Sequence, residues 1–506
     1  MRVLLIYPEY PDTFWSYKYA VGFIDKKAAY PPLGLLTVAA MIPAEWEKKV
    51  LDLNVEKLED DQLRWADYVF LSAMAVQRES TKEVIERCKE LGVKVVAGGP
   101  LFTTEGEEVG EVECLVLDEA EVTLPLFLED LHKGTLKKVY SSPEKPVLTE
   151  TPAPAWDLIK MDHYVAMSIQ YSRGCPFDCE FCDITFLLGR KPRLKARDQF
   201  LEELDALYLN GWRGTVFIVD DNFIGNKAVL KQDVLPAVIE WMENRKHPFR
   251  FLTEASINLS DDEELMEMMQ KAGFKEVFVG IETPDEESLK ECHKFHNAQR
   301  NLVDSVKKIH NHGIQVSGGF IVGFDNDPAS IFDAQINFIQ QSGIVTAMVG
   351  LLNAIKGSKL YDRLQRENRL LTEISDSNTD FTLNFVPKMD YNELMEGYRK
   401  IVTTIYNPAS FNKRVMAFFQ EFKPFKRRLT SNELNLRYLK ALFKASFYLG
   451  VLEKGRLSYW SLLLKTLFKY PRFLPEAVTF AVYGFHFRKV FALYGKNEDS
   501  EAWGDC

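Results

Sequence analysis

Three of the seven cysteines lie within eight consecutive positions, in the stretch YSRGCPFDCEFCD. Cys175, Cys179 and Cys182 follow the pattern CxxxCxxC. A structural zinc site needs four tetrahedral ligands, and a disulfide would leave one of the three cysteines over. Three thiolates can instead hold an iron–sulfur cluster and leave one iron open to a substrate or cosubstrate. The pattern predicts such a cluster; a zinc site completed by Asp183 or His163 is the alternative.

The other four cysteines, Cys88, Cys114, Cys292 and Cys506, are scattered and show no framework of pairs. This usage is typical of a reducing cytosol, where clustered cysteines bind metal or do chemistry. The start, MRVLLIYPEY, is too short an apolar run for a signal peptide, and no apolar stretch is long enough to span a bilayer. We therefore expect a cytoplasmic protein, and its 506 residues predict more than one domain.

The cysteines directly follow the first of six apolar stretches, each of which leads into a helical segment. The stretches span residues 166–174, 214–223, 249–259, 275–284, 314–324 and 344–352. Six strand–helix units predict a partial, parallel (β/α)6 barrel with its chemistry at the carboxyl ends of the strands. In the helix predicted over SDDEELMEMMQKAG, Ser260 is the expected N-cap.

Three of the later strands also end in polar positions. These are Asp220 and Asp221 after the second strand, Glu254 and Ser256 after the third, and Glu282 after the fourth. Parallel strands bring their carboxyl ends to one edge, so these residues are candidates for a binding site. Each carboxylate can alternatively be a solvated or salt-bridged loop residue.

An earlier strand–helix series precedes the barrel. Strands are expected over 2–8, 48–54, 67–73, 94–100 and 113–121, and helices over 33–42 and 79–92. This alternation predicts an α/β domain with a doubly wound, Rossmann-like sheet. The strand ends that would meet a ligand are Ser72, Ala73, Gly98, Gly99, Pro100, Glu119 and Glu121. The glycines can alternatively serve tight turns alone, and the proline-rich stretch 141–156 reads as a linker.

The C-terminal part is helical, aromatic and basic. Residues 411–495 contain 16 Lys and Arg but only four Asp and Glu, which gives this segment a net charge of +12. Because the whole chain has a net charge of −11, the remaining residues carry −23. Such a segment suits an anionic membrane surface. Helices that pack their aromatic side chains into a core, with solvated lysines, are the alternative. Charge alone would allow this segment to bind nucleic acid, but the sequence contains no recognisable nucleic-acid-binding motif, so we expect no nucleic-acid partner.

These motifs carry a family resemblance over roughly residues 1–490. CxxxCxxC with Phe181 before the last cysteine resembles the radical SAM superfamily. A doubly wound domain before the barrel, with PPLGLLTVAA, GGP and EAE, resembles the cobalamin-binding class of that superfamily. The runs RWADYVFLSAMAVQRES, VDDNFIGN, FVGIETPD and GFHFRK are similar to the branch that includes the hopanoid 2-methylase.

The resemblance implies three cofactors: a 4Fe–4S cluster, S-adenosyl-L-methionine (SAM) and cobalamin. The three cysteines would bind the cluster. Contacts to SAM would come from Phe181, Asp220, Asp221, Glu254, Ser256, Glu282, Gly319, Ile321 and Gly323, and contacts to cobalamin from Leu33, Gly34, Ser72, Ala73, Gly98, Gly99, Pro100, Glu119 and Glu121. The stretch GFIVGFDN resembles the family's GxIxGxxE strand through Gly319, Ile321 and Gly323, but Asn326 stands where that motif ends in Glu.

No histidine precedes His132, so the implied cobalamin is base-off, with no protein histidine on cobalt. A nucleotide-binding or purely structural first domain is the alternative, although GxGxxG is missing after its first strand.

The implied reaction moves a methyl group from methylcobalamin to an unactivated carbon, with flavodoxin or ferredoxin as the reductant. No side chain need act as acid or base, so no catalytic residue is named beyond the cluster ligands. If the basic tail meets the inner face of a membrane, a polycyclic or isoprenoid lipid is the expected substrate. A protein or peptide carbon, and a non-methylating rearrangement or cyclisation, stay open. A cobalamin-binding regulator stays open only if no cluster forms.

The expected domains follow from these patterns. They are a cobalamin-binding domain over 1–140, a linker over 141–165, a radical SAM barrel over 166–389, a basic aromatic helical domain over 390–496 and an acidic tail over 497–506.

Overall fold

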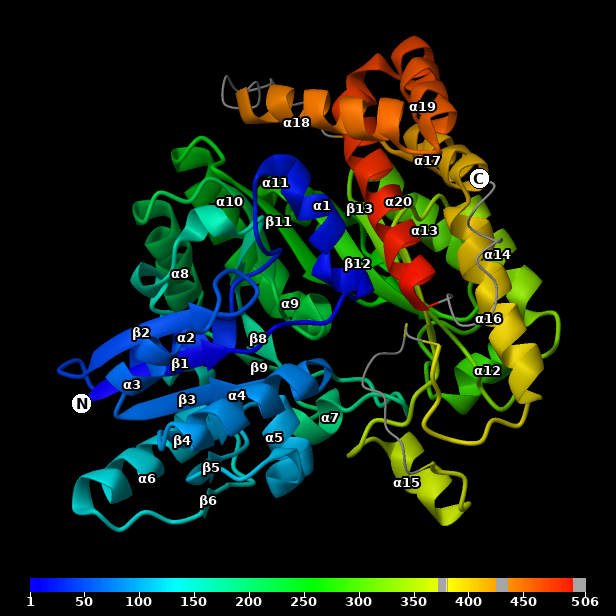
Figure 1. Ribbon diagram of the computed structural model, residues 1–506. Coiled ribbons are helices and arrows are strands. Elements are labelled where there is room, and N and C mark those ends of the chain that lie inside the picture. Colours follow the sequence, from blue (N-terminus) through cyan, green and yellow to red (C-terminus); the bar gives the residue numbers. More distant parts are fainter. Residues whose placement is uncertain (372–378, 380, 425–435, 495–506) are drawn as a thin grey trace. The chain divides into compact units, whose positions relative to one another are not determined.

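The computed structural model describes residues 1–371, 379, 381–424 and 436–494 (Figure 1). The predicted acidic tail, 497–506, lies outside the described residues. The chain divides into two compact units: Met1–Pro11, Lys27–Pro176 and Asp183–Asp221 form the first, and Asp12–Lys26, Phe177–Cys182 and Asn222–Cys506 form the second. Three of these boundaries cut the range 166–389, and the domain limits expected from the sequence remain predictions.

The first unit is built on a parallel sheet in the order β2-β1-β3-β4-β5-β6. Val3 and Leu5 enter one apolar core and Leu4 and Ile6 another, because successive side chains of a strand point to opposite faces. Helices α3, α4 and α5 supply side chains to one core, and α2 and α6 to the other. The sheet is therefore doubly wound, as predicted.

The strands of this sheet are β1 (Arg2–Tyr7), β2 (Glu47–Asp52), β3 (Tyr68–Ser72), β4 (Lys94–Gly98), β5 (Cys114–Val116) and β6 (Val139–Tyr140). Its helices are α2 (Leu33–Met41), α3 (Asp60–Trp65), α4 (Arg78–Glu90), α5 (Pro100–Glu105) and α6 (Ala120–Lys133). The same unit contains the parallel pair β7 (Ala166–Ile169) and β10 (Gly214–Ile218), the antiparallel pair β8 (Ser172–Arg173) and β9 (Arg193–Leu194), and the helices α7 (Ile184–Leu187) and α8 (Arg197–Leu209).

The second unit continues the strand–helix alternation. Its parallel strands are β11 (Phe249–Glu254), β12 (Phe274–Glu282), β13 (Gln315–Val322) and β14 (Ala347–Leu351). Its first helices are α1 (Lys18–Val21), α9 (Lys227–Val229), α10 (Leu235–Asn244), α11 (Glu263–Ala272), α12 (Glu286–Glu291), α13 (Leu302–Asn311), α14 (Ile331–Ser342) and α15 (Lys359–Arg366). All six expected barrel strands are therefore present. The expected N-cap is wrong: Asp262, not Ser260, accepts the hydrogen bond of Leu265 N at the start of α11.

The C-terminal part is helical, as predicted. Its helices are α16 (Tyr391–Tyr406), α17 (Pro408–Glu421), α18 (Leu436–Phe447), α19 (Arg456–Lys469) and α20 (Leu474–Tyr494), with a π-helical turn, Tyr448–Leu452, after α18. Figure 1 shows α18 and α19 in orange and α20 in red. Among the described helices, none is long and apolar enough to cross a bilayer.

Residues 12–26, which leave the first sheet after β1, pack within the second unit. The ring of Phe14 stacks on Phe487 of α20 at 4.0 Å, and Phe14 is fully buried. His486 Nε2 lies 3.0 Å from the carbonyl oxygen of Phe14. Trp15 Nε1 donates to Met348 Sδ on β14 at 3.0 Å. This segment therefore joins the C-terminal helices to the strands of the same unit.

Candidate functional site

Two aspartates at the end of β10 hold the backbone that leads into Cys175. Asp220 accepts hydrogen bonds from Tyr171 N (2.8 Å) and Ser172 Oγ (2.6 Å), and Asp221 accepts one from Gly174 N (2.9 Å). Both residues follow β10, which pairs with β7, so the carboxylates reach the segment after β7. The structure thus gives each aspartate a positioning contact, while its predicted contact to SAM remains a prediction.

Burial is the main influence on the pKa values of these two carboxyl groups. It raises the pKa of Asp220 to about 7 and that of Asp221 to about 6, against the lowering effect of their hydrogen bonds. Gly174 has φ +93°, and a Cβ there would approach the carbonyl oxygen of Gly189 to 2.7 Å. Cys175 N donates to the same carbonyl at 3.2 Å. The backbone therefore enters the cysteine loop in one fixed direction.

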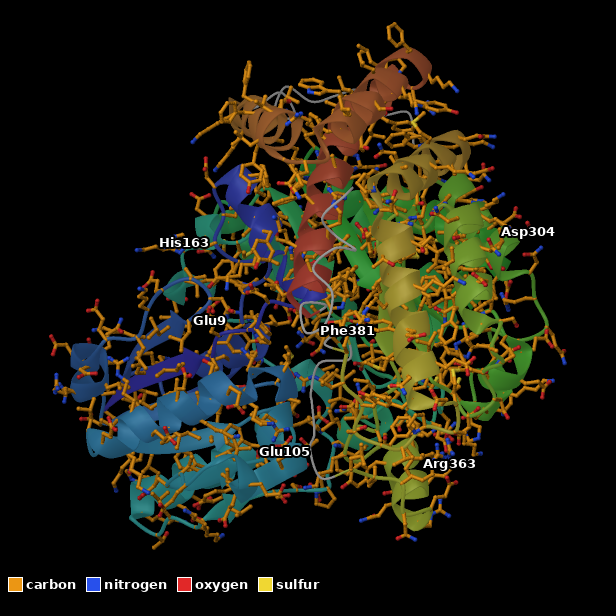
Figure 2. All side chains as sticks on the ribbon, turned by 45° about the vertical axis from the view of Figure 1, so that its right-hand side comes forward. Glu9, Glu105, His163, Asp304, Arg363 and Phe381 are labelled. Atoms are coloured by element: carbon orange, nitrogen blue, oxygen red, sulfur yellow. The ribbon has the colours of Figure 1, made fainter. Side chains whose placement is uncertain are left out.

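The other two cysteines belong to the second unit. Cys182 N donates to the carbonyl oxygen of Cys179 at 3.2 Å, which closes a turn. Between them, Glu180 N donates to the carbonyl oxygen of Cys292 at 3.0 Å. The Glu180 carboxylate accepts from Arg363 of α15 at 2.7 Å and 3.1 Å (Figure 2 labels Arg363). The loop is thus anchored by both its backbone and its side chains.

A buried ion pair lies beside Cys179. Lys294 Nζ is 2.5 Å from Glu282 Oε1, at the end of β12, and 5.8 Å from the ring centroid of Phe181. Burial lowers the pKa of Lys294, but the charges of Glu282 and Cys179 outweigh it, and the net pKa is raised. Lys294 therefore stays protonated. Gly280 leaves room for the pair, because a Cβ there would lie 2.5 Å from Lys294 Nζ and would also collide with Glu282 Oε1.

The backbone around Glu282 is held by two buried amides. Asn297 Nδ2 donates to the carbonyl oxygens of Gly280 and Ile281, both at 3.0 Å. Gln335 Nε2 donates to those of Glu282 (3.2 Å) and Ile321 (2.7 Å). Because Glu282 has φ +64°, an unusual conformation for a residue with a side chain, these bonds stabilise a strained strand end.

The end of β13 is fixed by Asp327. Its carboxylate accepts from Gly323 N (2.8 Å), Phe324 N (3.1 Å) and Ser288 Oγ (2.7 Å), while burial raises its pKa to about 6. Asn326, at the position where the family motif has Glu, donates its N–H to Glu291 at 2.8 Å. Gly319 faces Phe278, whose ring would lie 2.8 Å from a Cβ. Ile321 is buried in the strand.

Ser256 lies in a small amide cluster at the end of β11. Ser256 Oγ donates to Asn258 Oδ1 at 2.7 Å, and Asn222 Nδ2 donates to Ser256 Oγ at 3.3 Å. Glu254, the last residue of β11, is half-buried. The roles of both residues toward SAM remain predictions.

The donor set of the cysteine loop fits an iron–sulfur cluster, because three thiolates can bind three of its irons. Among the described residues, no group of three or more His, Cys, Asp or Glu side chains is arranged to hold one metal ion. In an iron–sulfur cluster each thiolate binds a different iron, so the three sulfurs need not converge on one point. Three cysteines and a neighbouring lysine suit an anionic cluster with one open iron.

The carboxyl ends of β3 and β4 lie close together. Gly99 has φ +88°, and a Cβ there would lie 2.7 Å from Ser72 Oγ and 3.1 Å from the carbonyl oxygen of Ala73. Leu101 N, in the helix that Pro100 opens, donates to that carbonyl at 3.0 Å. These contacts explain the glycine pair sterically, and the predicted contacts to cobalamin remain predictions. Around Gly34, in the first turn of α2 after Leu33, a Cβ would meet nothing within 4 Å.

Glu119 and Glu121 are bound by arginines of the same unit. Arg173 Nη1 lies 2.8 Å from Glu119 Oε2, and Arg173 Nη2 lies 2.7 Å from Glu121 Oε1. Arg193 Nη2 lies 2.7 Å from Glu119 Oε1. Burial raises the pKa of Glu121, but Arg173 more than offsets this, and the net pKa is lowered. Both glutamates are therefore paired with arginines, and they connect the first sheet to the strand before the cysteines.

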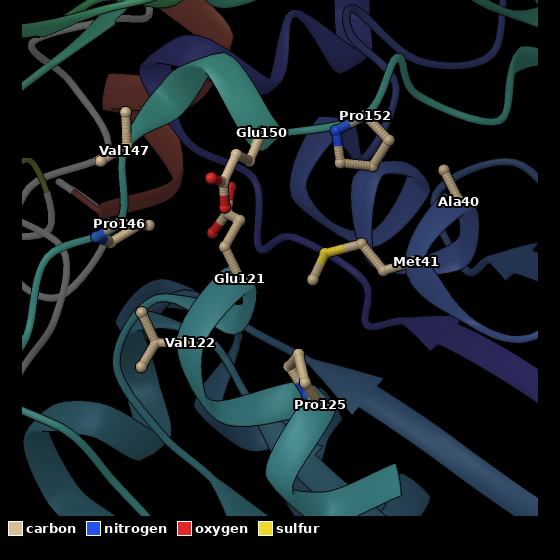
Figure 3. A pocket seen from close by; sticks show the side chains of 9 residues that line it. All are labelled: Ala40, Met41, Glu121, Val122, Pro125, Pro146, Val147, Glu150 and Pro152. Atoms are coloured by element: carbon tan, nitrogen blue, oxygen red, sulfur yellow. The ribbon is translucent and has the colours of Figure 1, made fainter.

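A cavity of about 460 Å³ lies between the ends of α2 and α6 and the linker (Figure 3). The carboxylates of Glu121 and Glu150 face each other in it, beside Met41. Of the predicted site residues, only Glu121 lines this cavity.

Three family models match the sequence. The B12 binding domain matches residues 23–128, the radical SAM superfamily matches 169–339, and a domain of unknown function matches 358–500. Over 490 residues the chain is 42% identical to an uncharacterised methyltransferase of Synechocystis sp., covering 96% of this chain and 91% of that protein. Over 480 residues it is 34% identical to the hopanoid C-2 methylase of Rhodopseudomonas palustris, covering 92% and 90%.

The chain belongs to the cobalamin-dependent radical SAM methyltransferase family. The fold agrees: TsrM from Kitasatospora setae, a radical SAM methyltransferase solved with cobalamin and a [4Fe–4S] cluster, superposes with a TM-score of 0.58 at 14% identity, over 91% of this chain and 99% of that one. The predicted family, fold class and enzyme class are confirmed. This methyltransferase uses SAM, a 4Fe–4S cluster and cobalamin.

Several residues of the methyltransferase were not found from the sequence. They are Asn222, Lys294, Asn297, Gln335, Arg173 and Arg193. Each acts on a partner at least 14 positions away along the chain, apart from Lys294, whose partner Glu282 is 12 positions away. Only the packed fold brings these side chains to the site.

Proposed function

We propose that the protein transfers a methyl group to an unactivated carbon of a polycyclic or isoprenoid lipid. The observation that carries this proposal is the 34% identity, over most of both chains, to a protein named hopanoid C-2 methylase. An unactivated carbon has no acidic proton and no lone pair, so its methylation needs radical chemistry. When bound, the cluster and SAM supply the hydrogen-abstracting radical, and methylcobalamin supplies the methyl group.

The residues of this chain bind and orient those cofactors. Cys175, Cys179 and Cys182 are the proposed cluster ligands, and Lys294 keeps a positive charge beside Cys179. We propose that SAM is contacted by the residues at the ends of the barrel strands and by Phe181. We propose that cobalamin is contacted by the residues at the ends of β3, β4 and β5 and at the start of α2. We further propose base-off cobalamin, an electron donor such as flavodoxin or ferredoxin, and a place in the cytoplasm, since clustered thiolates need reducing conditions.

A deletion strain compared with the wild type tests the substrate. Mass spectrometry of the lipid extract should show a lipid that lacks one methyl group in the deletion. A peptide that lacks the methyl group, found in the proteome of the same cells, would replace the lipid with a protein substrate. If no lipid and no peptide lacks a methyl group in the deletion strain, a non-methylating rearrangement or cyclisation replaces methyl transfer as the proposed reaction.

With purified enzyme, 5′-deoxyadenosine and S-adenosylhomocysteine should form in equal amounts with the methylated product. Deoxyadenosine without S-adenosylhomocysteine would contradict methyl transfer.

A further inference from the structure

The turn between α18 and α19, with the helices on either side, exposes an unusual density of apolar side chains. Of the 24 large hydrophobic side chains that are exposed among the described residues, ten lie between Phe443 and Phe468. Scattered exposed apolar residues need no explanation, but a concentration on one pair of helices marks an interaction site. We call the exposed apolar side chains of residues 443–468 the docking face.

Helix α19 is apolar on two opposite sides. Its exposed apolar residues are Leu457, Trp460, Leu464, Leu467 and Phe468. These recur three or four positions apart and so form one stripe along the helix. Its buried residues, Tyr459, Leu462, Leu463 and Thr466, form a second stripe, and the helix packs against α17 and α20. The core therefore accounts for one stripe only.

The segment before α19 extends the docking face. Phe443, Phe447 and Val451 are exposed and four positions apart, which again places them on one side of the helix. Trp460 Nε1 donates to the carbonyl oxygen of Gly450 at 2.9 Å, and a Cβ on Gly450 would lie 2.9 Å from the indole ring. The two helices are thus held closely together, and the docking face is a built surface.

The charge of this region selects among possible partners. Arg456, Lys465 and Lys469 are exposed on α19, which contains no acidic residue. Glu453, in the preceding turn, is half-buried and lies 4.0 Å from Lys489. A second copy of the chain would bring like charges together. Nucleic acid would pair with the cations but leave ten large apolar side chains in water.

We propose that the docking face binds the surface of an anionic lipid bilayer. The apolar stripe would enter the boundary between headgroups and acyl chains, the indole of Trp460 would lie at the interface, and the lysines would contact anionic headgroups. This surface would give the enzyme access to a substrate that dissolves in the bilayer. The inference does not require that the substrate be a lipid, because binding is measured on vesicles that contain no substrate.

Co-sedimentation of the full-length, cofactor-loaded protein with vesicles tests the proposal. The vesicles are phosphatidylcholine, with or without phosphatidylglycerol. Wild type should bind the anionic vesicles, and Leu457→Glu/Phe468→Glu should bind them at least tenfold more weakly. Leu209→Glu is the matched control, because Leu209 is 81% exposed, against 80% for Leu457, but lies on α8 of the first unit. It should bind like the wild type.

The charge contribution has its own variant. Lys465→Glu/Lys469→Glu should weaken binding to the phosphatidylglycerol vesicles, most strongly at low salt, because surface charges are screened by salt.

Two results would overturn the proposal. Equal sedimentation of the wild type and Leu457→Glu/Phe468→Glu would show that the docking face does not bind lipid. A wild-type dimer that this double variant dissociates would assign the docking face to a second copy of the chain. Methyl transfer to detergent-solubilised substrate, measured in parallel, separates a failure of docking from a failure of the proposed function.

Discussion

Lys294 carries a buried positive charge beside Cys179. It is buried, pairs with Glu282, and lies near both Cys179 and the ring of Phe181. Reduction adds negative charge to an iron–sulfur cluster, and a fixed positive charge nearby favours the reduced state. We expect Lys294→Met to make the reduction potential of the reconstituted cluster more negative. A redox titration followed by electron paramagnetic resonance measures it.

Lys290→Met is the control, since it removes the same charge from an exposed side chain on α12. An unchanged potential in Lys294→Met would contradict the role assigned to this lysine.

The same substitution should also destabilise the protein. In Lys294→Met, Glu282 stays buried without its partner, at a cost of about 3 kcal/mol in the free energy of unfolding. The pair Glu282→Gln/Lys294→Met removes both charges and should recover most of that loss. Urea unfolding of the two variants decides between them. Equal stabilities of the single and double variants would mean that the ion pair is not what stabilises this strand end.

Asp220 should make the stability of the protein depend on pH. An aspartate in the unfolded chain titrates near 4, and burial raises the pKa of folded Asp220 to about 7. The folded state therefore binds the proton more tightly. The stability contributed by this group is complete at low pH, falls as the pH rises from about 4 to about 7, and is constant above that.

In Asp220→Asn this titration is absent. The free energy of unfolding of the wild type, relative to the variant, should fall by about 2 kcal/mol between pH 5 and pH 7. Urea unfolding at several pH values measures the difference, and Asp221 titrates in both proteins. A difference that does not change with pH would refute the assignment.

At the residue scale, the sequence suggests candidate ligands more readily than the residues that support them. Cys175, Cys179 and Cys182 are proposed as cluster ligands from their spacing alone, because the cluster needs three close thiolates. Asp220 is found from its place after a strand, but its bonds to Tyr171 and Ser172 are not. Lys294 follows a helix in a loop without a motif, and only its packing against Glu282 distinguishes it from a surface lysine.

Regular elements are well predicted, because periods of 2 and 3.6 in apolar residues reflect one buried face. All six barrel strands and the helical character of the C-terminal part are confirmed. The segment 12–26 is the exception. It has aromatic residues in no regular period, and its partners on α20 lie more than 400 positions along the chain. Long-range packing of this kind leaves no local pattern.

Phe14 should therefore stabilise the second unit as strongly as a core residue does. Its ring is fully buried and stacks on Phe487. We expect Phe14→Ala to lower the free energy of unfolding by about 3 kcal/mol, the usual effect of removing a buried phenylalanine ring. Phe295→Ala, which changes a side chain that is 62% exposed, should have little effect. Similar unfolding midpoints for the two variants would show that this segment is not part of the core.

At the scale of the whole molecule, the C-terminal part divides into helices that pack in the core and helices that expose apolar side chains. Helices α17 and α20 bury Phe411, Phe418, Phe485 and Phe487. These two helices therefore pack their aromatic side chains into a core, which is one of the two roles expected from the sequence. The exposed apolar residues are concentrated on α18 and α19 instead. Composition alone could not separate the two, because both pairs of helices are rich in aromatic and basic residues.

The distribution of histidines across the molecule constrains how cobalt can be ligated. The first unit contains two, His132 and His163. His132 lies in the last turn of α6, and a helix that follows a parallel strand ends at the opposite edge of the sheet from the strand's carboxyl end. His163 is half-buried in the linker, where its carbonyl oxygen accepts from Lys27 N at 2.8 Å. Residues 23–128, matched by the B12 binding domain, contain no histidine at all.

We therefore expect the cob(II)alamin form of the enzyme to show no nitrogen coupling from a ligand on cobalt in its electron paramagnetic resonance spectrum. Free cob(II)alamin at neutral pH, with its own base bound to cobalt, is the reference that shows such coupling. If the protein-bound form shows it too, His163→Ala separates the two sources of nitrogen. Loss of the coupling in that variant would identify His163 as the ligand, and persistence would point to the base of cobalamin itself or to a histidine of the second unit; each of these results would overturn base-off binding without a protein ligand.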